Sequence, residues 1–181
     1  MTIHNAIATL GLLASLIGLP GLAGAASGPG HEHDAHADHG QHVMGGAQAS
    51  AADTDALRAI VAAIESGWET GSATPFRDNY VADADAYYVE GGGADVGLEH
   101  FVTHHVIPEG EVLADIELNL VPLSIDVRGD LAWLVASSEF RARVRSDDRL
   151  IHSTGFETIV FERVMGAWKV VHTHGSSRPV K

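Results

Sequence analysis

The chain has 181 residues, enough for one domain with a core of its own. It carries 24 acidic against 11 basic residues, a formal net charge of -13, and such a surface argues against nucleic acid as a partner. There is no cysteine, which excludes a thiol nucleophile, a thiolate metal site, disulfides and lipid attachment through cysteine.

The N-terminus has the pattern of an export signal. Residues 3–22 are apolar and uncharged, Gly18 and Pro20 break the run, and Ala23-Gly24-Ala25 is an A-x-A cleavage site. The segment before the run lacks Lys and Arg, which departs from the usual pattern, and an uncleaved membrane anchor is the alternative. We predict a signal peptide over residues 1–25, a periplasmic or secreted protein, and no membrane attachment after cleavage.

A histidine-rich segment follows. Residues 26–52 mix small and acidic residues with five histidines, and they hold too few apolar side chains to build a core. We predict a disordered tail that captures transition metals, with Cu(II) favoured over Ni(II) and Zn(II). The alternative is a solubilising linker with no metal-related role. The predicted tail ligands are His31, His33, His36, His39 and His42.

The folded domain is predicted over residues 53–181, with its helices first. Apolar residues recur at helical spacing over 53–68, with Asp53, Thr54 or Asp55 as the cap. Shorter helices are predicted at 75–80 and at 98–106, the second closed by Pro108, with a strand at 86–90 between them.

The rest of the chain is predicted as sheet. Strands at 116–127, 131–144, 150–164 and 167–174 are separated by short turns, the pattern of an antiparallel meander. Helices followed by a meander indicate an α+β fold, with the helices packed on one face of a curved antiparallel sheet.

Three motifs carry a resemblance to a known family. They are Tyr88-Val89-Glu90-Gly91-Gly92, Thr103-His104-His105, and the ending Trp168-Lys169-Val170-Val171-His172-Thr173-His174-Gly175-Ser176-Ser177-Arg178. With the element order, they resemble the SnoaL-like branch of the nuclear transport factor 2-like superfamily, over about residues 53–179. The resemblance implies a cone-shaped, cystatin-like α+β fold with a pocket between sheet and helices, and a homodimer. It implies no single function, because relatives include isomerases, dehydratases, polyketide cyclases and binding proteins without catalysis.

The candidate pocket residues are mostly histidines. His172 and His174 are two apart on the last predicted strand, so they share a face, which we expect to be the inward face of Trp168 and Val170. Glu90 ends an earlier strand and supplies a hard oxygen ligand. The predicted pocket is lined by Tyr88, Glu90, His105, His172 and His174, and the predicted pocket metal ligands are Glu90, His104, His105, His172 and His174.

The sequence favours a binding protein over an enzyme. The leading hypothesis is an exported protein that binds Cu or Zn, or a small molecule, in a histidine-lined pocket. The first alternative is a pocket enzyme of the isomerase or dehydratase type, in which His105, His172 or His174 acts as general base. The second is a non-catalytic dimeric interaction domain with a non-functional tail. Independently of these, the alternative to a pocket metal site is that the histidines are a polar pocket lining.

Overall fold

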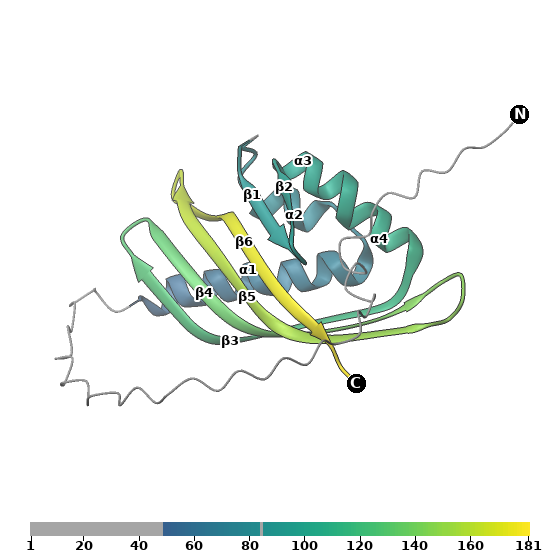
Figure 1. Cartoon of the computed structure of the whole chain (residues 1–181). Helices are drawn as coiled ribbons and strands as arrows, with labels where there is room; N and C mark the ends of the chain where they lie inside the picture. The colour runs from purple at the N-terminus through teal and green to yellow at the C-terminus, as the bar shows by residue number, and fades with distance from the viewer. Residues whose placement is uncertain (1–48, 84) are drawn as a thin grey trace, which may run out of the picture.

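The computed structural model describes residues 49–83 and 85–181 (Figure 1). The predicted signal peptide and the five tail histidines lie outside these residues. Within them, no helix is both long and apolar enough to cross a membrane.

Two helices open the domain. Helix α1 (Ala51–Thr70) begins two residues before the predicted boundary because Ser50, rather than Asp53, is its cap; the Ser50 hydroxyl accepts a hydrogen bond from the Asp53 backbone N–H at 3.0 Å. Its apolar stripe is buried against the sheet at Leu57, Ile60, Val61 and Ile64. Helix α2 (Thr74–Asn79) follows after a short turn.

The sheet has six strands in the order β2-β1-β6-β5-β4-β3. The long strands β3 (Leu113–Arg128), β4 (Leu131–Val144), β5 (Leu150–Val164) and β6 (Ala167–Pro179) form the predicted meander. Strand β1 (Tyr87–Glu90), however, pairs in parallel with β6, so the sheet is mixed rather than antiparallel throughout. Strand β2 (Gly93–Val96) was not predicted, because only a two-residue glycine turn separates it from β1.

The third helical segment is longer than predicted. Helix α3 (Leu98–Phe101) passes through a π-helical turn (Val102–Val106) into α4 (Ile107–Val112), so the expectation that Pro108 ends the helix is wrong. Pro108 follows directly after the π-helical turn, in which the Ile107 N–H bonds to the Val102 oxygen, and this irregular turn accommodates a proline inside the helical segment.

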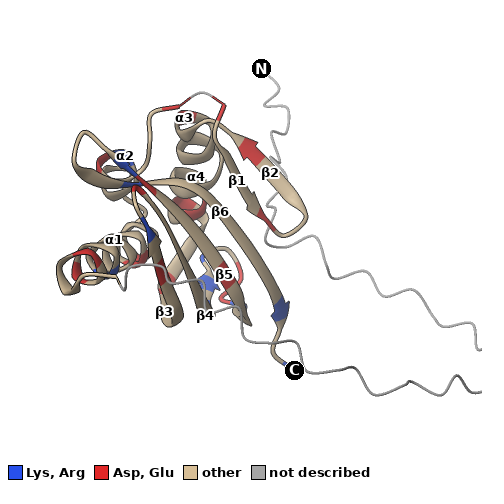
Figure 2. Ribbon diagram, turned by 90° about the vertical axis from the view of Figure 1, so that its left-hand side faces the viewer, with Lys and Arg blue, Asp and Glu red and all other residues tan. Residues whose placement is uncertain are grey.

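The helices cover one face of the sheet, and the core lies between the two layers. Figure 2 shows α1 and α2 at one side of the molecule and the β1–β2 hairpin at the other. Asp53 connects the start of α1 to strands β5 and β6, since its Oδ1 accepts hydrogen bonds from Arg163 Nη2 at 2.6 Å and from Trp168 Nε1 at 2.9 Å. The α+β arrangement predicted from the sequence, with helices packed on one face of a sheet, is confirmed.

Candidate functional site

A cavity lies between the helices and the inner face of the sheet. About 80 Å³ is open to the centres of water-sized molecules, and because one water needs ~10–15 Å³ on this measure, several waters or one compact organic group fit. Aromatic and aliphatic side chains make up most of its walls, namely Ile64, Trp68, Tyr80, Tyr88, Phe101, Leu118, Leu120, Phe140 and Ile159.

The polar part of the cavity wall is acidic. Glu90 ends β1, Asp95 lies in β2, Glu109 in α4 and Glu157 in β5, so four separate elements each contribute one carboxyl group. No lysine or arginine of the described chain lines this cavity. The cavity wall therefore offers several carboxyl groups as hydrogen-bond partners.

Glu90 and Glu157 share the space above Gly175 of β6. A Cβ atom at Gly175 would stand 2.6 Å from Glu157 Oε2 and 3.8 Å from Glu90 Cγ, so the absence of a side chain there makes room for both. Burial raises the pKa of Glu90 to about 7, and the charge of Glu109 adds to the effect. Burial, followed by the charge of Glu90, raises the pKa of Glu157 to about 8.

Two tyrosines complete this end of the cavity. Tyr88 is 1% exposed, and its hydroxyl is buried without a hydrogen-bond partner, a costly arrangement that a ligand would relieve. Tyr80 packs on it at a ring distance of 5.2 Å. Burial raises the pKa of Tyr80 well above its ordinary value and that of Tyr88 to about 12, so both hydroxyls keep their protons.

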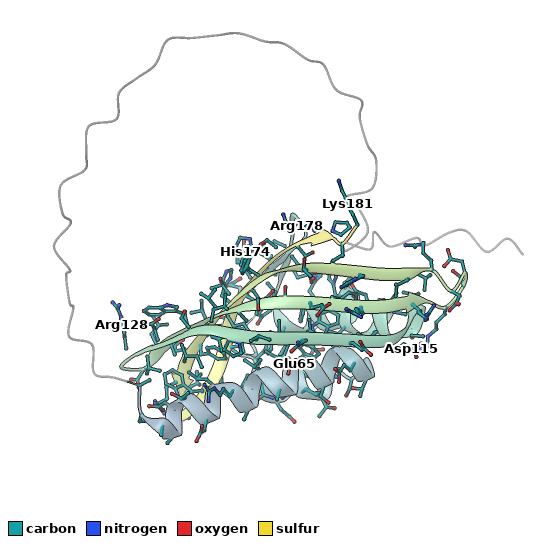
Figure 3. The ribbon with its side chains drawn as sticks, turned by 90° about the horizontal axis from the view of Figure 1, so that it is seen from below. Glu65, Asp115, Arg128, His174, Arg178 and Lys181 are labelled. Atoms are coloured by element: carbon teal, nitrogen blue, oxygen red, sulfur yellow. The ribbon has the colours of Figure 1, made fainter. Side chains whose placement is uncertain are left out.

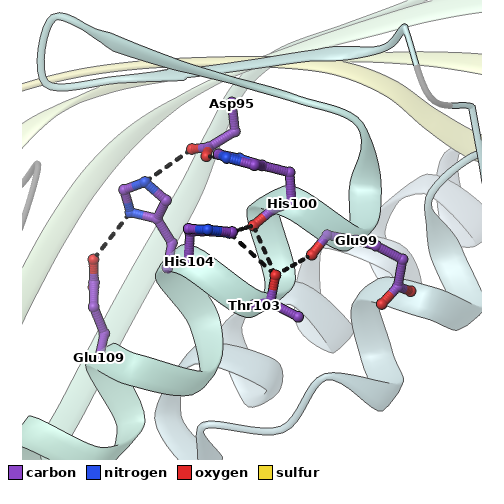
Figure 4. Close-up of polar contacts among 7 residues, drawn as sticks. Asp95, Glu99, His100, Thr103, His104 and Glu109 are labelled. Atoms are coloured by element: carbon purple, nitrogen blue, oxygen red, sulfur yellow. Dashed lines mark hydrogen bonds and ion pairs between the residues drawn. The ribbon is translucent and has the colours of Figure 1, made fainter. Parts of the chain in front are cut away.

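His105 lies between two carboxylates beside the cavity, and Figure 4 draws it as the unlabelled imidazole between Asp95 and Glu109. Its Nε2 lies 2.9 Å from Asp95 Oδ2 and its Nδ1 lies 3.3 Å from Glu109 Oε1. The hydrogen bond to Glu109 is the main cause that raises the pKa of His105, and the charge of Asp95 adds to it. Because both ring nitrogens face acceptors, His105 is held as an imidazolium and is poorly placed as a general base.

The expectation that His172 and His174 point into the pocket is wrong. The pairing of β6 with β5 shifts between Val160 and Phe161, so that Val171 is an extra residue in β6 and reverses the alternation beyond it. Before the extra residue, the even-numbered Trp168 and Val170 face inward. After it, the odd-numbered Thr173 and Gly175 face inward and line the cavity.

The two histidines lie on the opposite face of β6 from the cavity. His172 Nδ1 lies 2.8 Å from the backbone oxygen of Tyr87. His174 is exposed and lies away from helix α1 (Figure 3).

The predicted pocket metal set does not converge. Glu90 lines the cavity, His105 is bound to carboxylates beside it, His104 is exposed, and His172 and His174 face away. Over residues 49–83 and 85–181, no group of three or more potential ligands is arranged around one ion position.

Three acidic cavity residues were missed by the sequence reasoning. Glu157 has the same inward phase as Ile159 and Phe161, and Glu109 stands four residues after His105, so both carried a detectable signal. Asp95 carried none, because it lies in the strand that was not predicted.

The C-terminal part of the domain, residues 108–181, matches the SnoaL-like domain family. Comparison with curated protein sequences gives no match. A nuclear transport factor 2-like superfamily protein from Salmonella enterica is similar in structure, with a TM-score of 0.67 at 20% identity over 74% of this chain and 95% of that one.

Two further solved structures resemble the domain. A conserved protein from Planctomyces limnophilus has a TM-score of 0.66 at 17% identity, over 72% of this chain and 100% of that one. A protein with a cystatin-like fold from Caulobacter vibrioides has a TM-score of 0.56 at 19% identity, over 71% and 89%. At these identities the likeness establishes the fold and leaves the ligand open.

Proposed function

We propose that this chain, whose domain has the nuclear transport factor 2-like fold and matches the SnoaL-like family over residues 108–181, binds a small organic cation in its acidic cavity. The observation that carries the proposal is the composition of the lining: four carboxyl groups line the cavity, while lysine and arginine are absent from the described lining. A protonated amine on a compact apolar body complements both the carboxyl groups and the apolar walls.

The free cavity stores unfavourable interactions that such a ligand removes. Burial is the main cause that raises the pKa of both Glu90 and Glu157; the charge of Glu109 adds to it at Glu90, and the charge of Glu90 adds to it at Glu157. An ammonium group placed between them stabilises their ionised forms. Ligand binding therefore releases protons, and affinity rises as the pH increases from 6 to 8.

The aromatic walls favour the same class of ligand. Trp68, Tyr80, Tyr88 and Phe101 form a contiguous group, with Tyr88 and Phe101 at a ring distance of 5.2 Å and Trp68 and Phe101 at 5.9 Å. Aromatic faces attract cations and also bury flat apolar groups. The Tyr88 hydroxyl, which has no partner in the protein, is available to a polar atom of the ligand.

The test uses calorimetric titration of the full chain. The probes are arylalkyl amines from benzylamine to tryptamine, each compared with its alcohol isostere and with 3-phenylpropionate as an anion. We expect an amine to bind ~10-fold or more tightly than its alcohol, with no measurable binding of the anion. Equal or tighter binding of the alcohols would refute the cation preference.

Three substitutions locate the binding to the cavity. Glu90→Gln and Glu157→Gln keep the shape of each side chain but remove its charge, and each is expected to weaken amine binding about tenfold. Glu162→Gln is the matched control, because Glu162 lies on the same strand as Glu157 but is exposed. An effect of the control equal to that of the cavity variants would mean that the amine binds to the acidic surface.

Acid–base catalysis at the same carboxyl pair is the second candidate function. One observation favours it: with pKa values of about 7 and 8, Glu90 and Glu157 are available near neutral pH as proton acceptor and proton donor. The assay is isomerisation of a compact β,γ-unsaturated ketone such as 3-cyclohexenone, followed by the absorbance of the conjugated product. Turnover by the unmodified chain that is abolished in Glu90→Gln would support catalysis. If the chain binds amines but shows no turnover, the result would support a binding protein without catalytic activity.

We also propose that the protein acts outside the cytoplasm and that its tail captures Cu or Zn. The support is the apolar run ending in Ala23-Gly24-Ala25 and the five closely spaced histidines that follow. Fractionation of a Gram-negative host that expresses the chain, followed by N-terminal sequencing, tests whether the protein is exported and cleaved. A mature chain that begins at Ala26 in the periplasm is expected, and an intact chain in the cytoplasm would contradict it.

A homodimer is proposed through the outer face of the sheet. Val121, Leu123 and Phe156 are each at least half exposed on β3 and β5, and Val121 and Phe156 line a shallow hollow together with polar side chains. Exposed apolar groups of this kind are typical of an interface.

A further inference from the structure

A positive charge lies beside the acidic wall of the cavity. His105 Nε2 is 2.9 Å from Asp95 Oδ2 and its Nδ1 is 3.3 Å from Glu109 Oε1, and both of these carboxyl groups line the cavity. We infer that His105 determines specificity: its imidazolium occupies the Asp95–Glu109 pair and leaves Glu90 and Glu157 as the binding position for one ammonium group. The inference rests on the proposed binding of amines and narrows the ligand to a monocation.

The Asp95 and Glu109 carboxyl groups have partners within the protein. Asp95 is 7% exposed, and besides its contact with His105 its Oδ1 lies 2.6 Å from His100 Nδ1. Glu109 is 4% exposed and accepts a hydrogen bond from His105, four residues earlier in the same helical segment. A ligand cation therefore reaches either carboxyl group only by displacing a partner that the fold already holds there.

The His105 ring is fixed from several elements. Asp95 lies in β2, His105 in the π-helical turn and Glu109 in α4, so separate segments supply the two carboxylates. The ring of Phe101 stacks on the His105 ring at a centroid distance of 6.1 Å and 26° from parallel. With a carboxylate at each ring nitrogen and an aromatic ring on one face, the imidazolium is a preorganised part of the site.

Glu90 and Glu157 differ from the first pair in having no compensating charge of their own. Among the described residues neither forms an ion pair, and no hydrogen bond affects the pKa of either group. Both carboxyl groups line the same cavity as Asp95 and Glu109. An ammonium group that enters the cavity is therefore stabilised most at the Glu90–Glu157 end, where it displaces nothing.

The charge of His105 also acts inside the cavity. It lowers the pKa of Glu90, against the larger effect of burial, so the imidazolium and the Glu90 carboxyl group interact. A second ammonium group near Asp95 or Glu109 would lie beside the imidazolium, and like charges in a poorly solvated cavity repel strongly. The unmodified cavity is therefore expected to accept monoamines and to reject diamines.

The experiment compares 1,4-diaminobutane with pentylamine, in which a methyl group replaces one ammonium group, by calorimetric titration of the full chain at pH 7.5. We expect the unmodified chain to bind pentylamine about tenfold or more tightly than the diamine. His105→Ala removes the ring and its charge, and is expected to shift the ratio of the two affinities at least about tenfold toward the diamine. His105→Lys keeps a positive charge at this position and is expected to retain the preference for pentylamine.

Two further variants locate the effect. Asp95→Asn and Glu109→Gln, introduced together into the His105→Ala chain, are expected to remove the gain for the diamine, because its second ammonium group then meets no negative charge. His104→Ala is the matched control, since His104 is the exposed neighbour and does not line the cavity, and it should leave the ratio unchanged. Thermal unfolding verifies that each variant is folded. If His105 only stabilised the fold, its replacement would lower the melting temperature without changing the ratio.

An equal ratio of the two affinities in the unmodified chain and in His105→Ala would overturn the inference while leaving the amine-binding function intact. If neither amine binds to the unmodified chain, the amine-binding function and the inference both fail. A measurement without any variant is ¹H–¹⁵N NMR of the imidazole nitrogens at pH 7.5. It is expected to show the His105 ring protonated at both nitrogens, and a neutral ring would also overturn the inference.

Discussion

The pH dependence of stability should change sharply when Glu157 is replaced by glutamine. In the folded chain the pKa of Glu157 is raised from 4.5 to about 8, chiefly by burial and then by the charge of Glu90. Above pH 4.5 the unfolded chain releases this proton while the folded chain keeps it. The folded state is therefore penalised progressively as the pH rises through this interval, and the penalty is complete above pH 8.

The magnitude follows from the size of the shift. Each pH unit across the interval costs about 1.4 kcal/mol, so the loss between pH 5 and 7 is about 3 kcal/mol and the complete loss is about 5 kcal/mol. The Glu157→Gln chain has no proton to exchange at this position. Its free energy of unfolding is expected to exceed that of the unmodified chain by an amount that grows by about 3 kcal/mol from pH 5 to 7.

Urea unfolding at pH 5, 6, 7 and 8 measures this difference, and the titrating groups that do not interact with Glu157 cancel in the comparison. Glu162→Gln serves as the control on the exposed side of the same strand, and its curve should run parallel to that of the unmodified chain. Curves for Glu157→Gln and the unmodified chain that stay parallel across this range would refute the reasoning. They would mean that Glu157 ionises normally and that the cavity is open to water.

Four further outcomes are expected. Asp53→Asn should lower the melting temperature measured by calorimetry. Hydrogen bonds hold the pKa of Asp53 at about 2, so the stability that its carboxylate provides is present above pH 4 and is lost as the pH falls from 4 to 2. Gly155→Ala should destabilise by ~1–3 kcal/mol in urea unfolding, because the added Cβ would clash with the backbone oxygen of Ser176. Tyr88→Phe should raise the ligand-free stability by about 1 kcal/mol, since it removes an unpaired buried hydroxyl, and a loss of stability would show that the hydroxyl has a partner. Phe156→Lys should convert a dimer to a monomer in light scattering, and an unchanged mass would place any interface elsewhere.

Much of the fold follows from local patterns in the chain. The stripe of Leu57, Ile60, Val61 and Ile64 predicts α1, and the alternation from β3 to β6 predicts the meander, because both depend only on neighbouring residues. Two cavity residues were also within reach, since Tyr88 and Glu90 alternate on one short strand that ends at a glycine turn.

Tertiary structure decided which side chains reach the cavity. One extra residue at Val171 turns His172 and His174 to the outer face and puts Thr173 and Gly175 inside, and no local pattern marks the bulge because all these residues suit a strand. The acidic cluster likewise depends on the parallel pairing of β1 with β6, which brings together segments about eighty residues apart. Periodicity determines the elements from neighbouring residues alone, whereas the register between distant strands is set by burial and hydrogen bonding across the whole domain.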